Sequence, residues 1–224
     1  MNNKQFEQLR AEGFNRIPVY RSVLADLDTP LSVYLKLAEG VNSYLLESVE
    51  GGETWGRYSI IGLPCQRRYT VRGNTLLITE NGRMVSEETV SDPLARIAEL
   101  KDEFNIPQLD ELPLFSGGLV GFFAYETVRL IEPKLATDDK KDELGTADIE
   151  LLLSEEVAVL DNLEGRLWLI VHADPAQPEA WEQAQRRLEI LEQRLRLSGT
   201  GYGLRVGGEA IEEQDFSYGF DRED

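Results

Sequence analysis

Residues 149–172 read IELLLSEEVAVLDNLEGRLWLIVH, two apolar runs separated by polar residues and a glycine. The density of Val, Ile and Trp favours extended chain over helix. The polar break at 161–165 is typical of a turn between strands. We therefore predict a long hairpin of strands 149–160 and 166–172, near the centre of a sheet.

Shorter extended runs precede this hairpin. We predict strands at 43–49, 57–62, 67–72, 75–79 and 83–87, and extended chain at 17–20. Asn81-Gly82 lies between two of these runs, and this dipeptide is a strong hairpin signal because both turn positions need a positive φ. The strands are therefore expected to pair mostly antiparallel.

Two helices are expected before the strands. The first covers 3–12, with Phe6 and Leu9 on one face and Gly13 as its stop. The second opens with Thr29 as N-cap and Pro30 at the first helical position, a favoured combination. Its apolar stripe is expected to consist of Leu31, Tyr34, Leu35 and Ala38, and Gly40 is expected to end it.

Two further helices are predicted later in the chain. One opens at Asp92-Pro93 and the other covers 178–197. Their apolar residues recur at helical spacing: Leu94, Ile97, Leu100 and Phe104 in one, and Trp181, Ala184, Leu188, Leu191 and Leu195 in the other. Strands and helices do not alternate as in a Rossmann sheet. The pattern predicts an α+β fold, a mostly antiparallel sheet with helices packed on one side.

The charge balance narrows the range of partners. Asp and Glu number 41 against 23 Lys and Arg, a formal net charge of −18. Such a surface repels phosphates and anionic lipid, so neither nucleic acid nor a membrane is an expected partner. Neither an apolar run of 18 residues nor an apolar segment after Met1 occurs, which predicts a cytoplasmic location.

Single copies of cysteine and histidine limit the chemistry. Cys65 cannot form an intrachain disulfide, and His172 alone cannot build a multi-histidine metal site. We expect a packed thiol and a strand histidine rather than a nucleophilic pair. The sequence therefore assigns no catalytic and no metal-binding residue.

The glycine-rich run FSGGLVG at 115–121 suggests phosphate binding at first sight. It matches neither the dinucleotide fingerprint nor the P-loop. Adjacent glycines in an apolar strand mark a bulge or close backbone packing more often than a ligand. Close packing is the interpretation we favour.

The run YLLESVE at 44–50 has an alternating pattern. In a strand, successive side chains lie on opposite faces, which puts Tyr44, Leu46 and Ser48 on one face and Leu45 and Glu47 on the other. Two apolar walls and a hydroxyl suit a ligand with an aromatic body and a polar head, such as an amino acid. The alternative is a strand with one buried serine.

Two motifs resemble those of anthranilate synthase component I. LLES at 45–48, followed by GRYSIIG at 56–62, is similar to the family's amino-terminal region, and FSGGLVGFFAYE at 115–126 resembles its second signature. The resemblance covers essentially all 224 residues but only about half of the family's chain. It implies the amino-terminal half of that family's α+β fold.

The resemblance also implies a role. The family is a lyase that converts chorismate, with glutamine or ammonia, to anthranilate and pyruvate in tryptophan biosynthesis. Its catalytic residues and Mg²⁺ ligands lie in a chorismate-binding carboxyl-terminal region, expected after Asp224. We therefore expect 1–197 to be a regulatory and structural region that is inactive alone and needs no cofactor of its own. The glycine-rich, acidic range 198–224 is expected to be a linker.

The effector site is likewise implied by the resemblance. Family members are inhibited by L-tryptophan bound between the two regions, and Ser48 matches the serine that contacts it. Leu46 would wall the indole, and Glu47 would act indirectly, holding the strand or pairing with Arg57. A glutamine amidotransferase subunit, component II, is the implied protein partner. With half of the pocket, this chain is expected to bind tryptophan weakly or undetectably.

Three alternatives remain open. The sister enzyme aminodeoxychorismate synthase component I shares the fold, and its product would distinguish it. A free-standing amino-acid-binding regulatory module would bind its ligand at full strength by itself. A partner-docking role would rest on the acidic surface, but no residue in the sequence locates such an interface.

Overall fold

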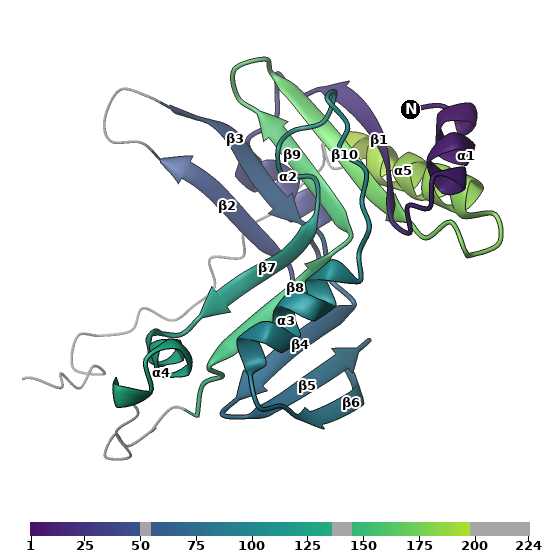
Figure 1. Cartoon of the computed structure of the whole chain (residues 1–224). Helices are drawn as coiled ribbons and strands as arrows, with labels where there is room; N and C mark the ends of the chain where they lie inside the picture. The colour runs from purple at the N-terminus through teal and green to yellow at the C-terminus, as the bar shows by residue number, and fades with distance from the viewer. Residues whose placement is uncertain (50–54, 136–144, 198–224) are drawn as a thin grey trace, which may run out of the picture.

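The computed structural model describes residues 1–49, 55–135 and 145–197. These residues form two five-stranded sheets in which all paired strands are antiparallel (Figure 1). The first sheet has the order β1 (Ile17–Leu24), β10 (Arg166–Ala173), β9 (Glu156–Asp161), β3 (Trp55–Gly62) and β2 (Tyr44–Val49). The second has the order β6 (Arg83–Thr89), β5 (Thr75–Glu80), β4 (Arg67–Arg72), β8 (Ile149–Ser154) and β7 (Gly118–Phe123).

The predicted strand at 149–160 is in fact two strands. β8 ends at Ser154 in the second sheet and β9 begins at Glu156 in the first, so only Glu155 separates them. The carbonyl of Glu155 still accepts a hydrogen bond from the His172 amide at 2.8 Å. Sheets twist, and a long strand can pass from one sheet to another through a local bend. The periodicity of the sequence does not reveal this change of partner.

The two predicted hairpins are confirmed. β9 and β10 pair across the 161–165 turn, where Gly165 has a φ of +62°. β5 and β6 pair across Asn81 and Gly82, whose φ values are +51° and +74°. Both central positions of the second turn therefore have the positive φ that the Asn-Gly dipeptide predicts.

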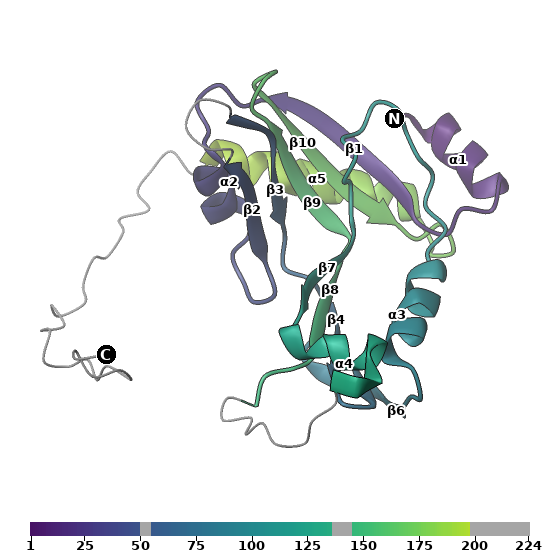
Figure 2. The same ribbon diagram turned by 60° about the vertical axis from the view of Figure 1, so that its left-hand side comes forward.

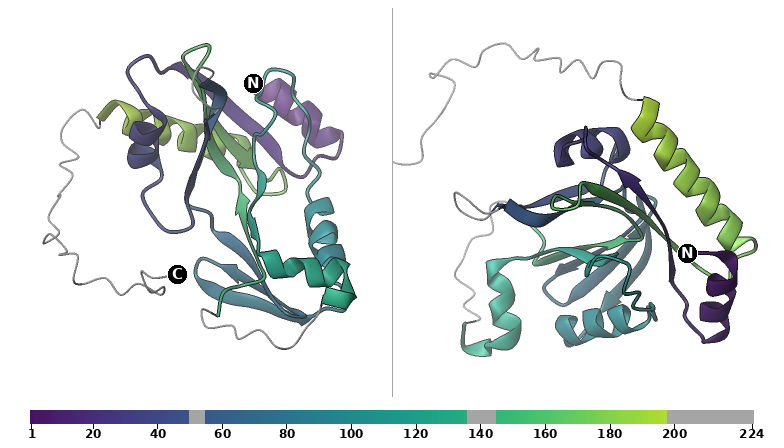
Figure 3. Two further views of the ribbon diagram at one scale, coloured as in Figure 1. Left: turned by 90° about the vertical axis from the view of Figure 1, so that its left-hand side faces the viewer. Right: turned by 90° about the horizontal axis from the view of Figure 1, so that it is seen from above.

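Helices cover one face of each sheet. On the first sheet these are α1 (Asn3–Ala11), α2 (Pro30–Leu37) and α5 (Ala180–Leu197), seen together in Figure 2. They share one apolar core with the strands, to which Phe6, Leu37 and Leu188 contribute fully buried side chains. The second sheet is covered by α3 (Pro93–Asp102) through Ile97 and Leu100. Figure 3 shows the resulting layers and confirms the predicted α+β class with helices on one side.

The predicted helix starts at Thr29 and Asp92 are confirmed, whereas α5 begins at Ala180 and not at the predicted 178. Thr29 accepts a hydrogen bond from the amide of Ser32, and Asp92 accepts one from the amide of Ala95. Asn2 caps α1 with a reciprocal bond to Gln5. These side chains satisfy amides that lack a partner in the first helical turn.

The predicted stripe of α2 is only half right. Ala38 is 4% exposed in the main core and Tyr34 packs against that core, as predicted. Val33 and Leu37 are fully buried, whereas Leu31 is 55% and Leu35 is 37% exposed. Both sets have helical spacing, so the pattern alone did not distinguish the two faces. The helix ends at Leu37, three residues before the predicted stop at Gly40, and Ala38 is its C-cap.

A short irregular segment follows β7. It contains a 3₁₀ turn at Tyr125–Thr127, α4 (Val128–Ile131) and a second 3₁₀ turn at Pro133–Leu135. None of the helices in the described ranges has the length and apolarity to cross a bilayer. The predicted linker 198–224 lies outside the described residues, so it stays a prediction.

Candidate functional site

The predicted effector residues lie on the ribbon formed by β2 and β3. Leu46 is opposite Ile60 and Glu47 is opposite Ser59. The register then shifts, because Val49 is opposite Trp55. Such a bulge breaks the regular alternation of faces, so the face predicted for Ser48 does not follow from the pattern. The backbone of Ser48 belongs to β2, but its side chain lies outside the described part of the chain.

Tyr44 anchors the first residue of this ribbon. Its hydroxyl is 2.8 Å from the Ser154 hydroxyl at the end of β8. Its ring lies so close to Gly62 that a Cβ there would overlap the ring carbons. Burial raises the pKa of Tyr44 to about 12, against the smaller opposing effect of the hydrogen bond between the Tyr44 and Ser154 hydroxyls. The start of β2 is therefore fixed at the junction of the two sheets.

Leu45 and Leu46 occupy opposite environments, as the alternation predicts. Leu45 packs against the helix-covered core of the first sheet. Leu46 is 48% exposed on the other face, beside its cross-strand neighbour Ile60. Ile60 belongs to a small apolar cluster around Val157, Val159 and Ile170. Leu46 therefore continues this cluster to the solvent-exposed edge of the sheet.

The suggested pairing of Glu47 with Arg57 is wrong. The Arg57 guanidinium donates to Asp161 at 2.8 Å and to Glu164 at 3.1 Å. Its planar group also stacks over the Tyr58 ring at 4.9 Å from the centroid. Glu47 is exposed and opposite Ser59. Arg57 thus fixes the β9–β10 turn, a role that the sequence pattern missed.

Asp161 is the buried partner in this arrangement. Its side chain is 2% exposed and accepts hydrogen bonds from the amides of Leu163 and Glu164 at 3.0 and 3.2 Å. Burial raises the pKa of this carboxyl, but the bonds from Arg57 and the two amides outweigh burial, so the pKa lies below its usual value. An aspartate that begins a turn and bonds the amides two and three residues later is a recognisable signal. Sequence reasoning placed the turn but not the partner of Arg57.

Cys65 and His172 are packed groups, as predicted. Both line a cavity of about 780 Å³ beside the sheet junction. Burial raises the pKa of the Cys65 thiol to about 11, which disfavours the nucleophilic thiolate. Burial lowers the pKa of His172, whose Nε2 lies 2.7 Å from the Ser116 carbonyl oxygen. The Cys65 thiol is therefore protonated at neutral pH, whereas the neutral His172 ring is held by its contact with the Ser116 carbonyl.

The glycine-rich run packs against neighbouring backbone, as predicted. Gly117 has a φ of +144°, and a Cβ there would lie 2.6 Å from His172 Nε2 and 2.8 Å from the Ser154 carbonyl oxygen. A Cβ on Gly121 would overlap the Glu150 carbonyl. The absence of side chains at these positions allows β7 to approach β8 and His172 closely.

Metal ligands do not gather in the described ranges. Within residues 1–49, 55–135 and 145–197, no three His, Cys, Asp or Glu side chains form a group that could hold an ion. The candidate site is thus a partly exposed apolar edge on β2 with the half-buried Tyr44 at one end.

Comparisons with known proteins place this arrangement in context. The chain is 48% identical over 225 residues to "Anthranilate synthase component 1" of Pseudomonas aeruginosa, a match that covers 100% of this chain and 46% of the relative. It is 47% identical over 201 residues to the protein of that name from Neisseria meningitidis serogroup C, covering 88% and 41%. The relative from Aquifex aeolicus is 40% identical over 206 residues, covering 89% and 41%. No protein-family model matches the chain.

A solved structure gives the same indication for the fold. The crystal structure of anthranilate synthase component I from Streptococcus pneumoniae TIGR4 matches with a TM-score of 0.51 at 24% identity, covering 78% of this chain and 36% of that one. The chain spans a little under half the length of the first-named relative. Over most or all of its length the chain therefore matches the amino-terminal part of anthranilate synthase component 1 from these relatives.

Proposed function

We propose that this chain is the regulatory and structural part of an anthranilate synthase, a lyase of tryptophan biosynthesis. In this role β2 supplies one wall of a feedback site for L-tryptophan. The observation that carries the proposal is the half-exposed Leu46, which extends an apolar cluster to the open edge of a sheet. Burying such a side chain against an indole ring is favourable by about 1–2 kcal/mol.

The remaining predicted residues have different parts in this proposal. The hydroxyl of Ser48 would bond the polar head of the amino acid, and Leu46 would contact the ring. Glu47 and Arg57 would act from outside the pocket, Arg57 by fixing the turn that carries Asp161. The bulge beside Ser48 is a further reason to expect a specialised role there, because bulges re-aim side chains.

The reaction itself is assigned to the part of the relatives that this chain does not span. Conversion of chorismate and ammonia to anthranilate and pyruvate would take place there, with Mg²⁺ held by its carboxylates, and component II would supply ammonia from glutamine. This chain alone is expected to be inactive. The names of the relatives support this activity over aminodeoxychorismate synthesis.

Feedback then has a simple physical form. Tryptophan must bind one arrangement of the two parts more tightly than another, and the difference in affinity sets the shift between them. A pocket with one of its walls removed loses most of its contact area. We expect calorimetry to detect weak or no binding of L-tryptophan to this chain, and a micromolar Kd would contradict the proposal.

The sharper test uses a chimera of residues 1–224 followed by the part of the Pseudomonas aeruginosa relative beyond the match. Leu46→Asp and, separately, Ser48→Ala should raise the tryptophan concentration for half-inhibition at least tenfold while leaving uninhibited anthranilate formation unchanged. The matched control is Val85→Asp on edge strand β6, where the side chain is 54% exposed against 48% for Leu46. Equal inhibition curves for Leu46→Asp and Val85→Asp would refute the assignment of β2.

A further inference from the structure

The sheets have four edge strands, and three of them are protected against further pairing. β1 contains Pro18 and Arg21, and β2 contains Glu47 and a bulge. β6 contains the charged residues Arg83, Glu87 and Glu88. Proline, charge and bulges are the usual features that prevent an edge from recruiting another strand. These three edges are therefore protected against pairing with a further strand.

The fourth edge, on β7, has none of these features. Its sequence GLVGFF contains no charge and no proline, and its register with β8 is unbroken from Gly118 to Phe123. In the described part of the chain it is the last strand of its sheet. An apolar, regular and unprotected edge is a template for another strand.

The backbone of β7 is oriented for such pairing. The Ala124 amide donates to the Asp148 carbonyl at 2.8 Å, one step beyond the Phe123–Ile149 pair. Hydrogen-bonded and non-hydrogen-bonded pairs alternate along an antiparallel ladder. The backbone groups of Leu119, Gly121 and Phe123 therefore point away from β8, toward the open edge.

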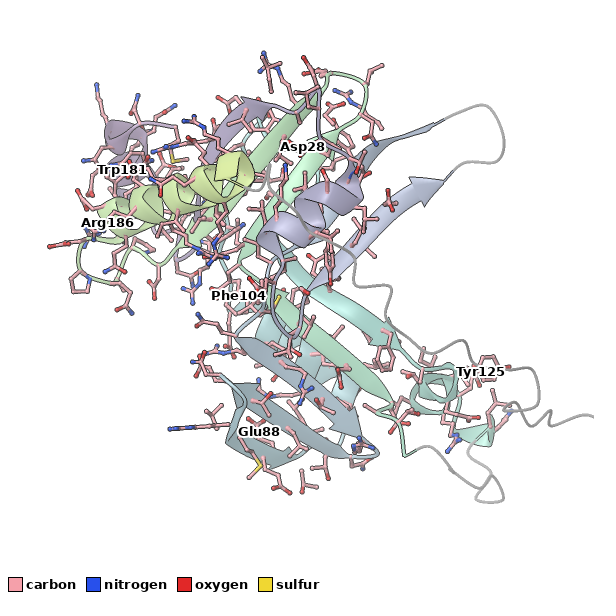
Figure 4. The ribbon with its side chains drawn as sticks, turned by 180° about the vertical axis from the view of Figure 1, so that it is seen from behind. Asp28, Glu88, Phe104, Tyr125, Trp181 and Arg186 are labelled. Carbon is pink, nitrogen blue, oxygen red and sulfur yellow. The ribbon has the colours of Figure 1, made fainter. Side chains whose placement is uncertain are left out.

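The side chains next to this edge are apolar and exposed. Phe122 and Phe123 are consecutive in the strand, so they lie on opposite faces, yet they are 46% and 52% exposed. Tyr125, Ile131 and Leu135 follow with exposures of 85%, 67% and 52%. Figure 4 shows Tyr125 at the end of the molecule remote from α5 with its Trp181. Five large apolar groups within fourteen residues are more than a solvated strand end requires.

β7 also shares its side of the molecule with β2. Tyr44 of β2 contacts Ser154, and Ser154 is paired with Gly118 of β7, so the two edge strands begin at one point. From there they diverge, as Figures 1 and 2 both show. An occupant that covers both edges must be a folded body rather than a single peptide.

We propose that the outer edge of β7 pairs with a β-strand from the part of anthranilate synthase component 1 that this chain does not span. The relatives supply an occupant of the required size, because more than half of the Pseudomonas aeruginosa protein lies outside the match. The occupant pairs with the amides of Leu119, Gly121 and Phe123 and covers Phe122 and Tyr125. This pairing does not involve tryptophan, so its test can fail without refuting the proposed effector site, and the reverse is also true.

The test is amide hydrogen exchange on residues 118–124, in this chain alone and in the same chimera. We expect exchange at the outward-facing amides of positions 119, 121 and 123 to slow at least tenfold in the chimera. Phe122→Lys with Phe123→Lys should abolish that protection. The control pair Met84→Lys with Val85→Lys, on edge strand β6 of the same sheet, should leave it intact; these side chains are 61% and 54% exposed.

Two outcomes overturn the proposal. One is equal exchange at these three amides in the chain and in a chimera whose added part is itself protected. The other is protection already present in the chain alone, together with a concentration-dependent dimer in sedimentation that the Phe122→Lys and Phe123→Lys pair dissociates. The second result would make another copy of the chain the occupant of β7.

Discussion

At the scale of single residues, glycines decide how closely the strands approach. Gly121 has the ordinary backbone conformation of a strand, so its importance lies in the space that a side chain would occupy. The obstacle is the backbone carbonyl of Glu150, which cannot move without breaking the β7–β8 ladder. A methyl group is therefore not tolerated there without displacement of a strand.

We predict that Gly121→Ala lowers the free energy of unfolding by about 1–3 kcal/mol, toward the upper end because the obstacle is backbone. Urea unfolding measures this. Phe123→Ala, on the same strand, removes a half-exposed side chain without a clash and should change stability by about 0.5 kcal/mol or less. Similar losses for both variants would contradict the close approach.

Tyr44 provides a prediction about pH. The folded pKa of about 12 lies above the ordinary tyrosine pKa of 10.0, so the neutral phenol is stabilised in the fold. The stability from this group is fully present below pH 10.0 and is lost as pH rises toward about 12. Tyr44→Phe should therefore lose less stability than the parent chain over that interval, as followed by circular dichroism.

The same variant has a cost at neutral pH. Removing the hydroxyl leaves the Ser154 hydroxyl without this partner, which costs about 1 kcal/mol. Burial also raises the pKa values of Tyr20 and Tyr69. Ultraviolet titration of the parent chain should therefore show several late-ionising tyrosines, and Tyr44→Phe should remove one of them. Parallel stability curves for the two proteins between these pH values would mean that Tyr44 ionises freely.

The roles of individual residues could be predicted only in part from the sequence. The packed roles of Cys65 and His172 and the close approach at Gly117 were predicted, because each follows from residue type and local pattern. The partner of Arg57 was not, since Asp161 is more than a hundred residues away and meets it only through the pairing of β3 with β9. The side-chain role of Ser48 stays a prediction.

At the scale of elements, local signals fixed the starts of helices and the positions of turns. Capping residues and Asn-Gly act on their immediate neighbours, so sequence suffices for them. The buried face of α2 and the division of 149–160 into β8 and β9 depend on which surfaces the element meets. Both possible faces of α2 have helical spacing, so the sequence does not show which of them is buried. The run 149–160 is continuously apolar, so the sequence does not show where one strand ends and the next begins.

The α2 face gives a direct prediction. Leu37 is 0% exposed and packs in the main core, whereas Leu35 is 37% exposed. Leu37→Ala should lower the free energy of unfolding by about 2–5 kcal/mol, and Leu35→Ala by about 1 kcal/mol or less. Urea unfolding of the two variants distinguishes the faces. The reverse order would restore the stripe predicted from the sequence.

At the scale of the whole molecule, the two sheets are joined by continuous strands. β8 passes into β9 with one residue between them, and β3 passes into β4 through residues 63–66. These two crossings run side by side, because β3 pairs with β9 and β4 pairs with β8. The cores of the two sheets are distinct clusters, yet no flexible linker separates them. The expected unit 1–197 stays a prediction.

This continuity predicts a single cooperative unfolding transition, and the tryptophans make it testable. Trp55, Trp168 and Trp181 belong to β3, β10 and α5, all in the first sheet or its covering helix. Their fluorescence reports that half, whereas far-ultraviolet circular dichroism reports both. In urea the two signals should have the same midpoint, as two-state unfolding requires.

Leu76→Ala, in the core of the second sheet where Leu76 is 0% exposed, should lower the fluorescence midpoint as much as the dichroism midpoint. Leu114→Ala, at a fully exposed position, should move neither. If Leu76→Ala lost dichroism before fluorescence changed, the two sheets would be separate folding units, and the strand crossings would not couple the β2 edge to the β7 edge.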